Sequence, residues 1–308
     1  MTRQGKAEAA LLATTFIWGG TFAVVKLAMD DVSPILLIAI RFVVAALIVL
    51  AFGYRKIFPL PGSVIQKGTI LGLFLFLGFL TQNIGLTITT ASKSAFITGM
   101  MVLFVPMLQF VIERRAPKIG NIVGVLLVTV GLWFLTSPEG SSFNIGDALT
   151  LVCAVLFAIY IVYLDVVSKE TSTERLLFLQ LGSMAVFSLV ALALFETPRF
   201  NVNTTSVVSM IYLTLLATLL TTLVQTRFQK ETTPTRAVVI FSVEPVIASG
   251  VAYLLLGEIL GALGLLGGAL IIAGVLLSEL SDSIPLLNRS VDGSLDVPED
   301  RPGTRSAI

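Results

Sequence analysis

The chain has 308 residues, of which 56% are hydrophobic and only 13% are charged, and its net charge is +1. Soluble domains are about 45–50% apolar and about 25% charged, so this composition excludes a water-soluble fold of this size. The single cysteine, Cys153, excludes an internal disulfide. Because the chain contains no histidine, it lacks the usual proton carrier near neutral pH. The sequence therefore predicts an integral membrane protein.

Ten apolar runs follow one another along the chain, each close to the roughly 20 residues that a helix needs to cross the hydrocarbon. Pro34 opens the second run, and Pro117 and Pro234 mark turns between others. Arg3 and Lys6 precede the first run, which lacks a small-residue cleavage site, so we expect a retained span rather than a removed signal peptide. The predicted spans are residues 9–28, 34–52, 68–88, 94–112, 119–136, 146–166, 174–195, 206–227, 236–256 and 260–279.

The basic residues orient these spans. With both termini on one side, sixteen Lys and Arg residues fall on that side, whereas only Lys26, Lys93 and Arg199 fall on the other. Cytoplasmic loops carry the excess of Lys and Arg. We therefore expect a multi-pass protein of the inner (plasma) membrane with cytoplasmic N- and C-termini. Residues 281–308 are polar, proline-containing and of mixed charge, which predicts a flexible cytoplasmic tail.

The two halves of the chain resemble each other. One constant spacing, called the first offset here, aligns Glu8 with Asp147, Trp18 with Phe157, Arg41 with Gln180 and Pro106 with Pro245. A slightly longer spacing, called the second offset, aligns Gln82 with Gln225, Gly124 with Gly267 and Gly131 with Gly274. Five spans per copy is an odd number, so the second copy enters the membrane from the opposite side. Such inverted repeats are typical of transporters in which the halves rock about a central site. The alternative is a duplicated scaffold without a pathway.

We therefore predict an all-α protein of ten transmembrane helices arranged as two inverted five-helix repeats. Residues 1–140 form the first repeat, residues 141–280 the second, and residues 281–308 the tail. Pro106 and Pro245 are the candidate bend points for rocking.

Three segments resemble the drug/metabolite transporter superfamily, EamA type: FIWGGTFAVVK in the first span, TTASKSAFITGMMVLFVP leading into the fourth, and VEPVIASGVAYLLLGE in the ninth. The resemblance covers residues 8–279. It implies ten helices in two inverted halves around a central cavity, and export of amino acids, aromatic ones among them, or of other small metabolites.

Polar side chains within the spans normally face the protein interior or a wet cavity, which makes several of them candidates for substrate binding. Trp18, beside two glycines, offers a stacking surface, although a buried indole in tight helix packing is the alternative. Amides both donate and accept hydrogen bonds, but they also serve as bonds between helices. The candidate amides are Gln82, Asn83 and the repeat-related Gln225.

Hydroxyl groups complete the predicted substrate site. Ser94 and Thr98 are four residues apart and share one helix face, although such hydroxyls often bond back to their own helix. Tyr160 lies deep in the sixth span and is the remaining cavity candidate.

Two charged residues, Glu244 and Arg41, lie well away from the ends of their spans. Glu244 is about eight residues into a helix, or about 12 Å deep, where a charge costs roughly 2.5–3.5 kcal/mol. Protonation, a cationic partner or a wet cavity would lower that cost. Proton coupling and a local structural role are both open for Glu244. Arg41 could pair with Glu244, with a substrate carboxylate or with backbone carbonyls, and we favour a structural pair or carbonyl clamp.

These features predict a secondary transporter that exports a small polar metabolite, most simply an amino acid or analogue, by alternating access. The alternatives are a channel-like facilitative uniporter and a transporter of a drug, nucleoside or sugar derivative. A membrane enzyme would need carboxylates, His or Cys clustered within the bilayer. Nucleotide hydrolysis would need a phosphate-binding Gly-x4-Gly-Lys loop, which is missing from the sequence. We expect a small-molecule substrate and the lipid bilayer as partners, with no cofactor, metal or nucleic acid. The pattern predicts no oligomeric state.

Overall fold

The computed structural model describes residues 2–113, 118–136, 143–257, 259, 262–280 and 287. The expected flexible tail, residues 281–308, lies outside these ranges apart from Leu287. Within them the chain is mostly helical, and an isolated β-bridge joins Val32 to Phe200. Helices satisfy their own backbone hydrogen bonds, which a lipid-embedded chain requires.

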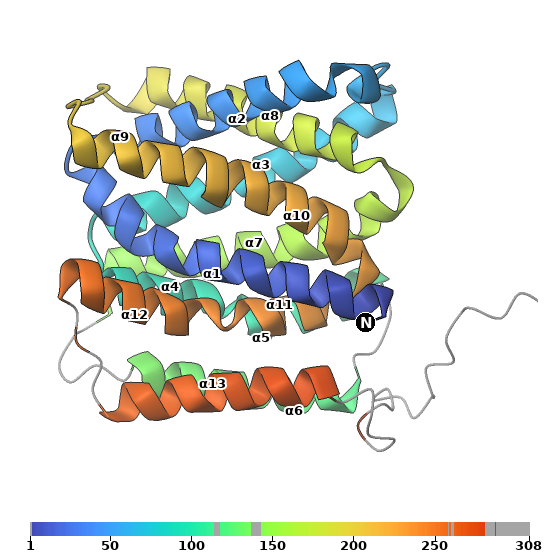
Figure 1. Ribbon diagram of the computed structural model, residues 1–308, viewed down its shortest axis with the longest axis vertical. Helices are drawn as coiled ribbons and strands as arrows, with labels where there is room; N and C mark the ends of the chain where they lie inside the picture. Colours follow the sequence, from blue (N-terminus) through green and yellow to red (C-terminus); the bar gives the residue numbers. More distant parts are fainter. Residues whose placement is uncertain are drawn as a thin grey trace, which may run out of the picture.

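The described helices run lengthwise beside one another in a layered bundle (Figure 1). The first half contains α1 (Arg3–Met29), α2 (Pro34–Ile57), α3 (Gly62–Leu86), α4 (Ala91–Gly99), α5 (Met101–Glu113) and α6 (Ile119–Thr136). The second half contains α7 (Ile145–Glu170), α8 (Thr173–Phe195), α9 (Thr204–Ile211), the π-helix η1 (Tyr212–Leu220), α10 (Thr221–Phe228), the 3₁₀-turn η2 (Gln229–Glu231), α11 (Pro234–Phe241), α12 (Glu244–Leu256) and α13 (Ala262–Leu280).

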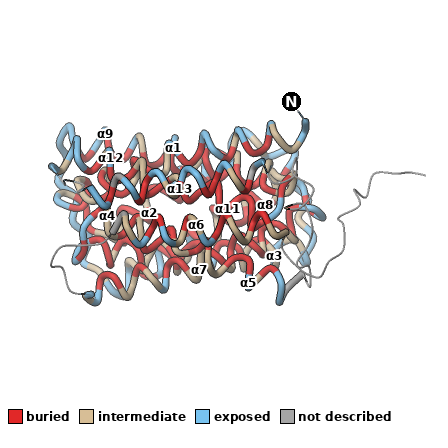
Figure 2. Tube along the Cα trace, turned by 90° about the horizontal axis from the view of Figure 1, so that it is seen from below, coloured by how far each residue is buried: buried red, intermediate tan, exposed pale blue. Residues whose placement is uncertain are grey.

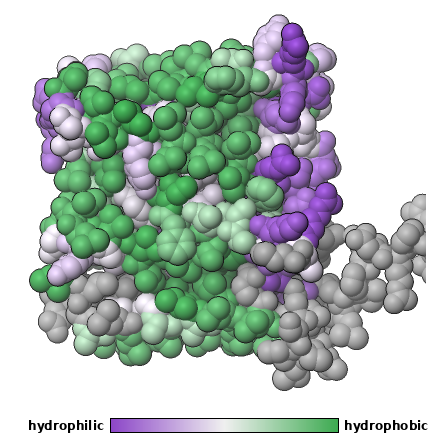
Figure 3. All heavy atoms as spheres, in the orientation of Figure 1, coloured by the Kyte–Doolittle hydropathy of each residue, from purple (hydrophilic) through white to green (hydrophobic). Residues whose placement is uncertain are grey.

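Eight of the described helical stretches are long and apolar enough to cross a membrane. Two of them are joined pairs, namely α4 with α5 and α11 with α12, and a third is the run from α9 to η2. The helices α6 and α13 are apolar but shorter. Hydrophobic side chains cover the middle of the visible face, whereas hydrophilic ones gather toward the ends of the helices (Figure 3). This arrangement is that of a multi-pass membrane protein.

Buried residues lie along the helices on the sides that meet their neighbours, and exposed residues are frequent at the two ends of the bundle (Figure 2). Local caps set where several helices begin. Asn144 caps α7 in a capping box with Asp147, and Asn203 does the same for α9 with Ser206. Pro34 and Pro234 stand in the first turns of α2 and α11, where a missing N–H costs no helical bond.

Two spans that the sequence suggests to be continuous are broken. The fourth span breaks at Met100, between α4 and α5, and the ninth breaks at Ser242 and Val243, between α11 and α12. The prolines do not occupy equivalent places, because Pro106 lies inside α5 whereas Pro245 is in the first turn of α12. The predicted bend at Pro106 is therefore displaced, and the break precedes it along the chain.

The starts of several helices recur at the two offsets found in the sequence. The helices α4, α5 and α6 start one second offset before α11, α12 and α13, and α2 starts one first offset before α8. The second offset thus persists across both breaks, so the alignment of Pro106 with Pro245, which needs the first offset, is not followed by the structure.

The helices α6 and α13 cross at glycines. A Cβ on Gly124 would meet Gly274 O at 2.9 Å, and a Cβ on Gly131 would meet Gly267 O at 2.7 Å. These contacts show that the two helices run antiparallel and that their backbones touch. Because nothing larger fits, small residues are required on both sides of the crossing.

We expect Gly124→Ala to destabilise the protein, because the added methyl overpacks the α6–α13 crossing at a cost of roughly 1–3 kcal/mol. The measurement is the melting temperature in detergent, and Gly250→Ala is the matched control, since a Cβ there meets nothing within 4 Å. An equal melting temperature for both variants would contradict this packing.

Candidate functional site

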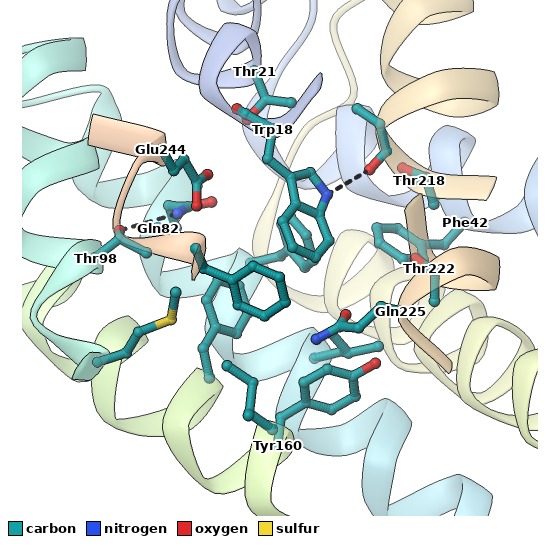
Figure 4. A pocket seen from close by; sticks show the side chains of 17 residues that line it. Trp18, Thr21, Phe42, Gln82, Thr98, Tyr160, Thr218, Thr222, Gln225 and Glu244 are labelled. Atoms are coloured by element: carbon teal, nitrogen blue, oxygen red, sulfur yellow. Dashed lines mark hydrogen bonds between the residues drawn. The ribbon is translucent and has the colours of Figure 1, made fainter. Parts of the chain in front are cut away.

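A pocket lies between the two halves of the bundle, beside both broken spans. Its free volume, including its open mouth, is about 650 Å³. Seventeen described residues line it. Polar groups from both halves converge on this mostly apolar space (Figure 4), which is the usual composition of a small-molecule site.

Most of the lining residues form repeat-related pairs. Trp18 pairs with Phe157 and Thr21 with Tyr160 at the first offset, and five further pairs follow the second offset. Those five are Leu75 with Thr218, Phe79 with Thr222, Gln82 with Gln225, Thr98 with Phe241, and Met101 with Glu244. Fourteen of the seventeen residues are therefore accounted for by seven pairs, which shows that corresponding faces of the two halves meet at the pocket.

Trp18 reaches into the centre of this space, with Glu244 on one side and Thr218 and Thr222 on the other (Figure 4). Its indole N–H donates to Thr221 Oγ1 at 3.0 Å and to Ala217 O at 3.3 Å. The ring of Phe241 packs edge-on at 5.3 Å between centroids. The indole is thus held by groups from η1, α10 and α11, and part of it stays accessible from the pocket.

The repeat-related side-chain amides of Gln82 and Gln225 each leave a hydrogen-bond acceptor available at the pocket. Gln82 Nε2 donates to Thr98 Oγ1 at 3.2 Å, and Gln225 Nε2 donates to Gln229 Oε1 at 2.9 Å. Neither Oε1 atom accepts a hydrogen bond from another residue that the structure describes. Tyr160 lies beneath Gln225 in Figure 4, and its hydroxyl donates to Gln180 Oε1 at 2.9 Å.

Glu244 is the first residue of α12, rather than the eighth residue of an unbroken helix. Its residue exposure is 9%, and it lines the pocket. No hydrogen bond or ion pair joins its carboxylate to another described residue. A helix N-terminus favours negative charge, so the break places this carboxylate where the protein tolerates it and leaves it facing the cavity.

Arg41 lies behind the opposite wall of the pocket and does not pair with Glu244. Its Nε and Nη2 donate to Thr218 Oγ1 at 3.1 and 3.0 Å, and its guanidinium lies 5.3 Å from the ring centroid of Phe79. Arg41 is 1% exposed, and its Nη1 has no hydrogen-bond partner among the described residues. The expected carbonyl clamp is therefore replaced by a threonine hydroxyl and an aromatic face, with one donor left over.

The π-helix η1 explains how Thr218 reaches Arg41. Thr218 Oγ1 donates to Leu213 O, five residues earlier, at 2.7 Å. Because π-turns shift the register of the residues that follow, they are frequent at functional sites. The run YLTLLATLL carries no sequence signal for this turn, so Thr218 was not identified from the sequence. Thr222 was missed as well, and its repeat relation to Phe79 is the one signal that could have found it.

Two predicted residues lie away from the pocket. Asn83 is buried, and its Nδ2 is 3.5 Å from Pro34 O at the start of α2. Ser94 is buried on the side of α4 that faces α7, with its Oγ 3.5 Å from Thr150 Oγ1. The structure thus brings Trp18, Gln82, Thr98, Tyr160, Gln225 and Glu244 together at one cavity and leaves these two in helix packing.

Known proteins resemble this chain in sequence or in fold. A transporter of Archaeoglobus fulgidus, named as uncharacterized, is 34% identical over 275 residues, covering 89% of this chain and 86% of its own. A protein of Salmonella typhimurium named as a probable amino-acid metabolite efflux pump is 25% identical over 281 residues, covering 86% of this chain and 91% of its own. One crystal structure matches with a TM-score of 0.74 at 18% identity, over 90% of this chain and 97% of that chain, and so shows the fold alone.

The model of the EamA-like transporter family matches the chain twice, at residues 5–137 and again at residues 144–280. Together the two matches cover nearly all of the helical part of the chain. This chain belongs to the EamA-like transporter family.

Proposed function

We propose that this protein is a secondary transporter that exports an amino acid or a similar zwitterionic metabolite by alternating access between two inverted halves. The observation that carries the proposal is the pairwise lining of the pocket. A site built from corresponding faces of two repeats lies at their junction, so rocking one half against the other exposes it to either side of a membrane.

The crossing of α6 and α13 supports the inverted arrangement. Gly124 corresponds to Gly267 and Gly131 to Gly274, and the observed contacts join Gly124 to Gly274 and Gly131 to Gly267. When the two halves are swapped, each of these two contacts becomes the other. A two-fold axis between the halves produces this relation. We propose that α6 and α13 also cross the membrane, which gives ten spans, with repeats at residues 1–140 and 141–280 and both termini on the cytoplasmic side of the inner (plasma) membrane.

The charges beside the pocket favour a zwitterion. The carboxylate of Glu244 faces the cavity from one side without a cationic partner among the described residues. The guanidinium of Arg41 lies behind Thr218, Phe42 and Phe79 on the other side, and its Nη1 is unpaired. An ammonium near Glu244 would neutralise that carboxylate, and a substrate carboxylate at the other side would be attracted by the guanidinium of Arg41 through the wall.

An aromatic or otherwise apolar side chain suits the remaining surface, which is made of Trp18, Phe79, Phe157 and other nonpolar groups. Offset or edge-on ring contacts contribute about 0.5–1.5 kcal/mol each beyond the area that they bury. The name of the Salmonella relative agrees with an amino-acid-like substrate and with export.

Glu244 also offers a coupling mechanism. A carboxylate that binds either a proton or the substrate ammonium, but not both, makes the two compete for one site. In that scheme the proton gradient drives export, since protonation of Glu244 releases the substrate on one side. By thermodynamic linkage, a bound proton lowers the affinity for the substrate by the same factor as a bound substrate lowers the affinity for the proton.

Transport by the purified protein in proteoliposomes tests the substrate class. We expect saturable, proton-gradient-driven transport of at least one amino acid, and we expect Glu244→Gln to abolish accumulation driven by a pH gradient. Full gradient-driven accumulation by the Glu244→Gln protein would contradict proton coupling through this residue.

Substrate pairs that differ by one charge test the two ends of the site. We expect Arg41→Gln to weaken transport of the amino acid about tenfold, because it removes the positive charge behind the pocket wall that attracts the substrate carboxylate, and to leave the corresponding amine unaffected. Glu244→Gln should instead remove the preference for the amino acid over its deaminated acid. Equal losses for all three compounds would contradict the assignment of the charged groups to opposite ends.

The repeat-related amides make a third test. We expect Gln82→Leu and Gln225→Leu each to raise the KM for transport by roughly five- to tenfold, because each removes an acceptor from the pocket. Gln66→Leu, at an exposed position of α3, is the matched control and should leave the KM unchanged. An unchanged KM in both pocket variants would remove the amides from the binding site.

A further inference from the structure

A buried acidic residue of α1 is ion-paired to the start of α11. Arg236 Nε lies 3.0 Å from Glu8 Oε1, and Thr232 Oγ1 donates to the same oxygen at 3.1 Å. The side chains of Arg236 and Glu8 are 5% and 10% exposed. We call Glu8, Thr232 and Arg236 the Glu8 cluster. It joins the first half of the chain to the second.

A second cluster joins α7 to the start of α4. Lys93 Nζ is ion-paired with Asp147 Oδ2, and Thr89 Oγ1 donates to Asp147 Oδ1 at 2.7 Å. The side chain of Asp147 is fully buried, and that of Lys93 is 17% exposed. We call Thr89, Lys93 and Asp147 the Asp147 cluster. It also joins the two halves, but here the second half supplies the acid and the first half supplies the threonine and the base.

The two clusters correspond residue by residue. Thr89 aligns with Thr232 and Lys93 with Arg236 at the second offset, and Glu8 aligns with Asp147 at the first. Even the helix caps match, since Thr90 accepts from Lys93 N at 3.1 Å and Thr233 accepts from Arg236 N at 3.2 Å. In each cluster one half supplies the acid, and the other half supplies the threonine and the base.

The clusters lie at opposite ends of the bundle. Glu8 is near the start of α1, whereas Lys26, near the end of the same helix, donates to Thr89 O at 2.6 Å. The helix between these two positions spans about 27 Å at 1.5 Å per residue. Figure 1 shows α1 starting at the end where α11 begins, and α4 lying toward the other end.

Each cluster also holds the outer end of a half-helix that reaches the pocket. Lys93 lies in the first turn of α4, and Thr98 near the end of that helix lines the pocket. Arg236 lies in the first turn of α11, and Phe241 at the end of that helix lines the pocket as well. Both half-helices end at a break in the backbone beside the cavity. Releasing one cluster would therefore free one half-helix and open the pocket toward that end alone.

We propose that the Glu8 cluster and the Asp147 cluster are the two gates of the transport cycle, and that each must open for the pocket to reach its own side of the membrane. The proposal rests on the alternating-access function above. Both ion pairs are formed in this structure, so opening one gate leaves the other in place at the opposite end. Gates of this kind are bistable because a buried charge is costly once its partner has moved away.

Thiol accessibility tests the gates without knowledge of the substrate. In a Cys153→Ala background, Leu75→Cys places one reporter thiol in the pocket. A membrane-impermeant maleimide is applied to oriented proteoliposomes from the Glu8 side or from the Asp147 side. The variants are Arg236→Gln and Lys93→Gln, which break one cluster each, and the matched control is Lys56→Gln at the exposed pair with Glu174.

We expect Arg236→Gln to raise labelling from the Glu8 side about tenfold relative to the other side, and Lys93→Gln to shift labelling equally in the opposite direction, as a two-state shift requires. Lys56→Gln should behave like the parent. The charge-swapped pairs, Glu8→Arg with Arg236→Glu and Lys93→Asp with Asp147→Lys, keep an ion pair in each cluster and should return labelling toward the parent pattern.

Opposite shifts with charge-swap rescue support the gates. A parent protein labelled from both sides, with both single variants unchanged or shifted in the same direction, would overturn the gates and leave alternating access standing. Labelling from one side only in the parent and in every variant would instead contradict alternating access itself. If the Arg236→Gln protein cannot be purified and Lys93→Gln leaves the labelling unchanged, the ion pairs serve folding alone. That result would overturn the proposal.

Discussion

A charge within a bilayer must face protein or water, because the hydrocarbon offers it no partner. This constraint explains where four buried charged residues of this chain lie. Glu244 stands at a helix start and faces the pocket, Arg41 is bound by Thr218 and packed against aromatic rings, and Glu8 and Asp147 are each neutralised by a base from the other half. These four charges therefore lie at the contact between the halves, where the proposed movement takes place.

Duplication gives these charges their arrangement. Because corresponding segments meet across the contact, one local motif is used twice: a threonine just before the cap of a half-helix and a base in its first turn hold an acid of the other half. The pocket itself departs from symmetry where the chemistry requires it. Glu244 corresponds to Met101, and Arg41 to Gln180, so each charged group occurs in one half alone. The symmetric residues suit the movement, and the asymmetric ones suit recognition of a particular substrate.

Much of the fold can be predicted from the sequence, because span length and basic loops follow directly from the thickness and charge asymmetry of a membrane. The breaks at Met100 and Ser242–Val243 could not be placed, since Pro106 and Pro245 are stronger local signals than the residues at which the helices stop. The π-helix that contains Thr218 contacts α1 through Tyr212 and contacts Arg41 through Thr218, and its apolar sequence does not distinguish it from an α-helix. Asn83 and Ser94 show the limit for the site: polarity within a span indicates burial, but it does not tell a cavity from a helix contact.

The central claim, that the second half is inverted relative to the first, can be tested by the sidedness of two helix starts. In a Cys153→Ala background, single cysteines at Gln4, before α1 crosses, and at Asn144, before α7 crosses, are labelled in intact cells with a membrane-impermeant thiol reagent. Inverted halves predict that the cysteine at position 144 reacts from outside and that the cysteine at position 4 reacts only after the cells are opened. Labelling of both positions from the same side would contradict the inverted arrangement, and with it the pairing of the two ends on which alternating access depends.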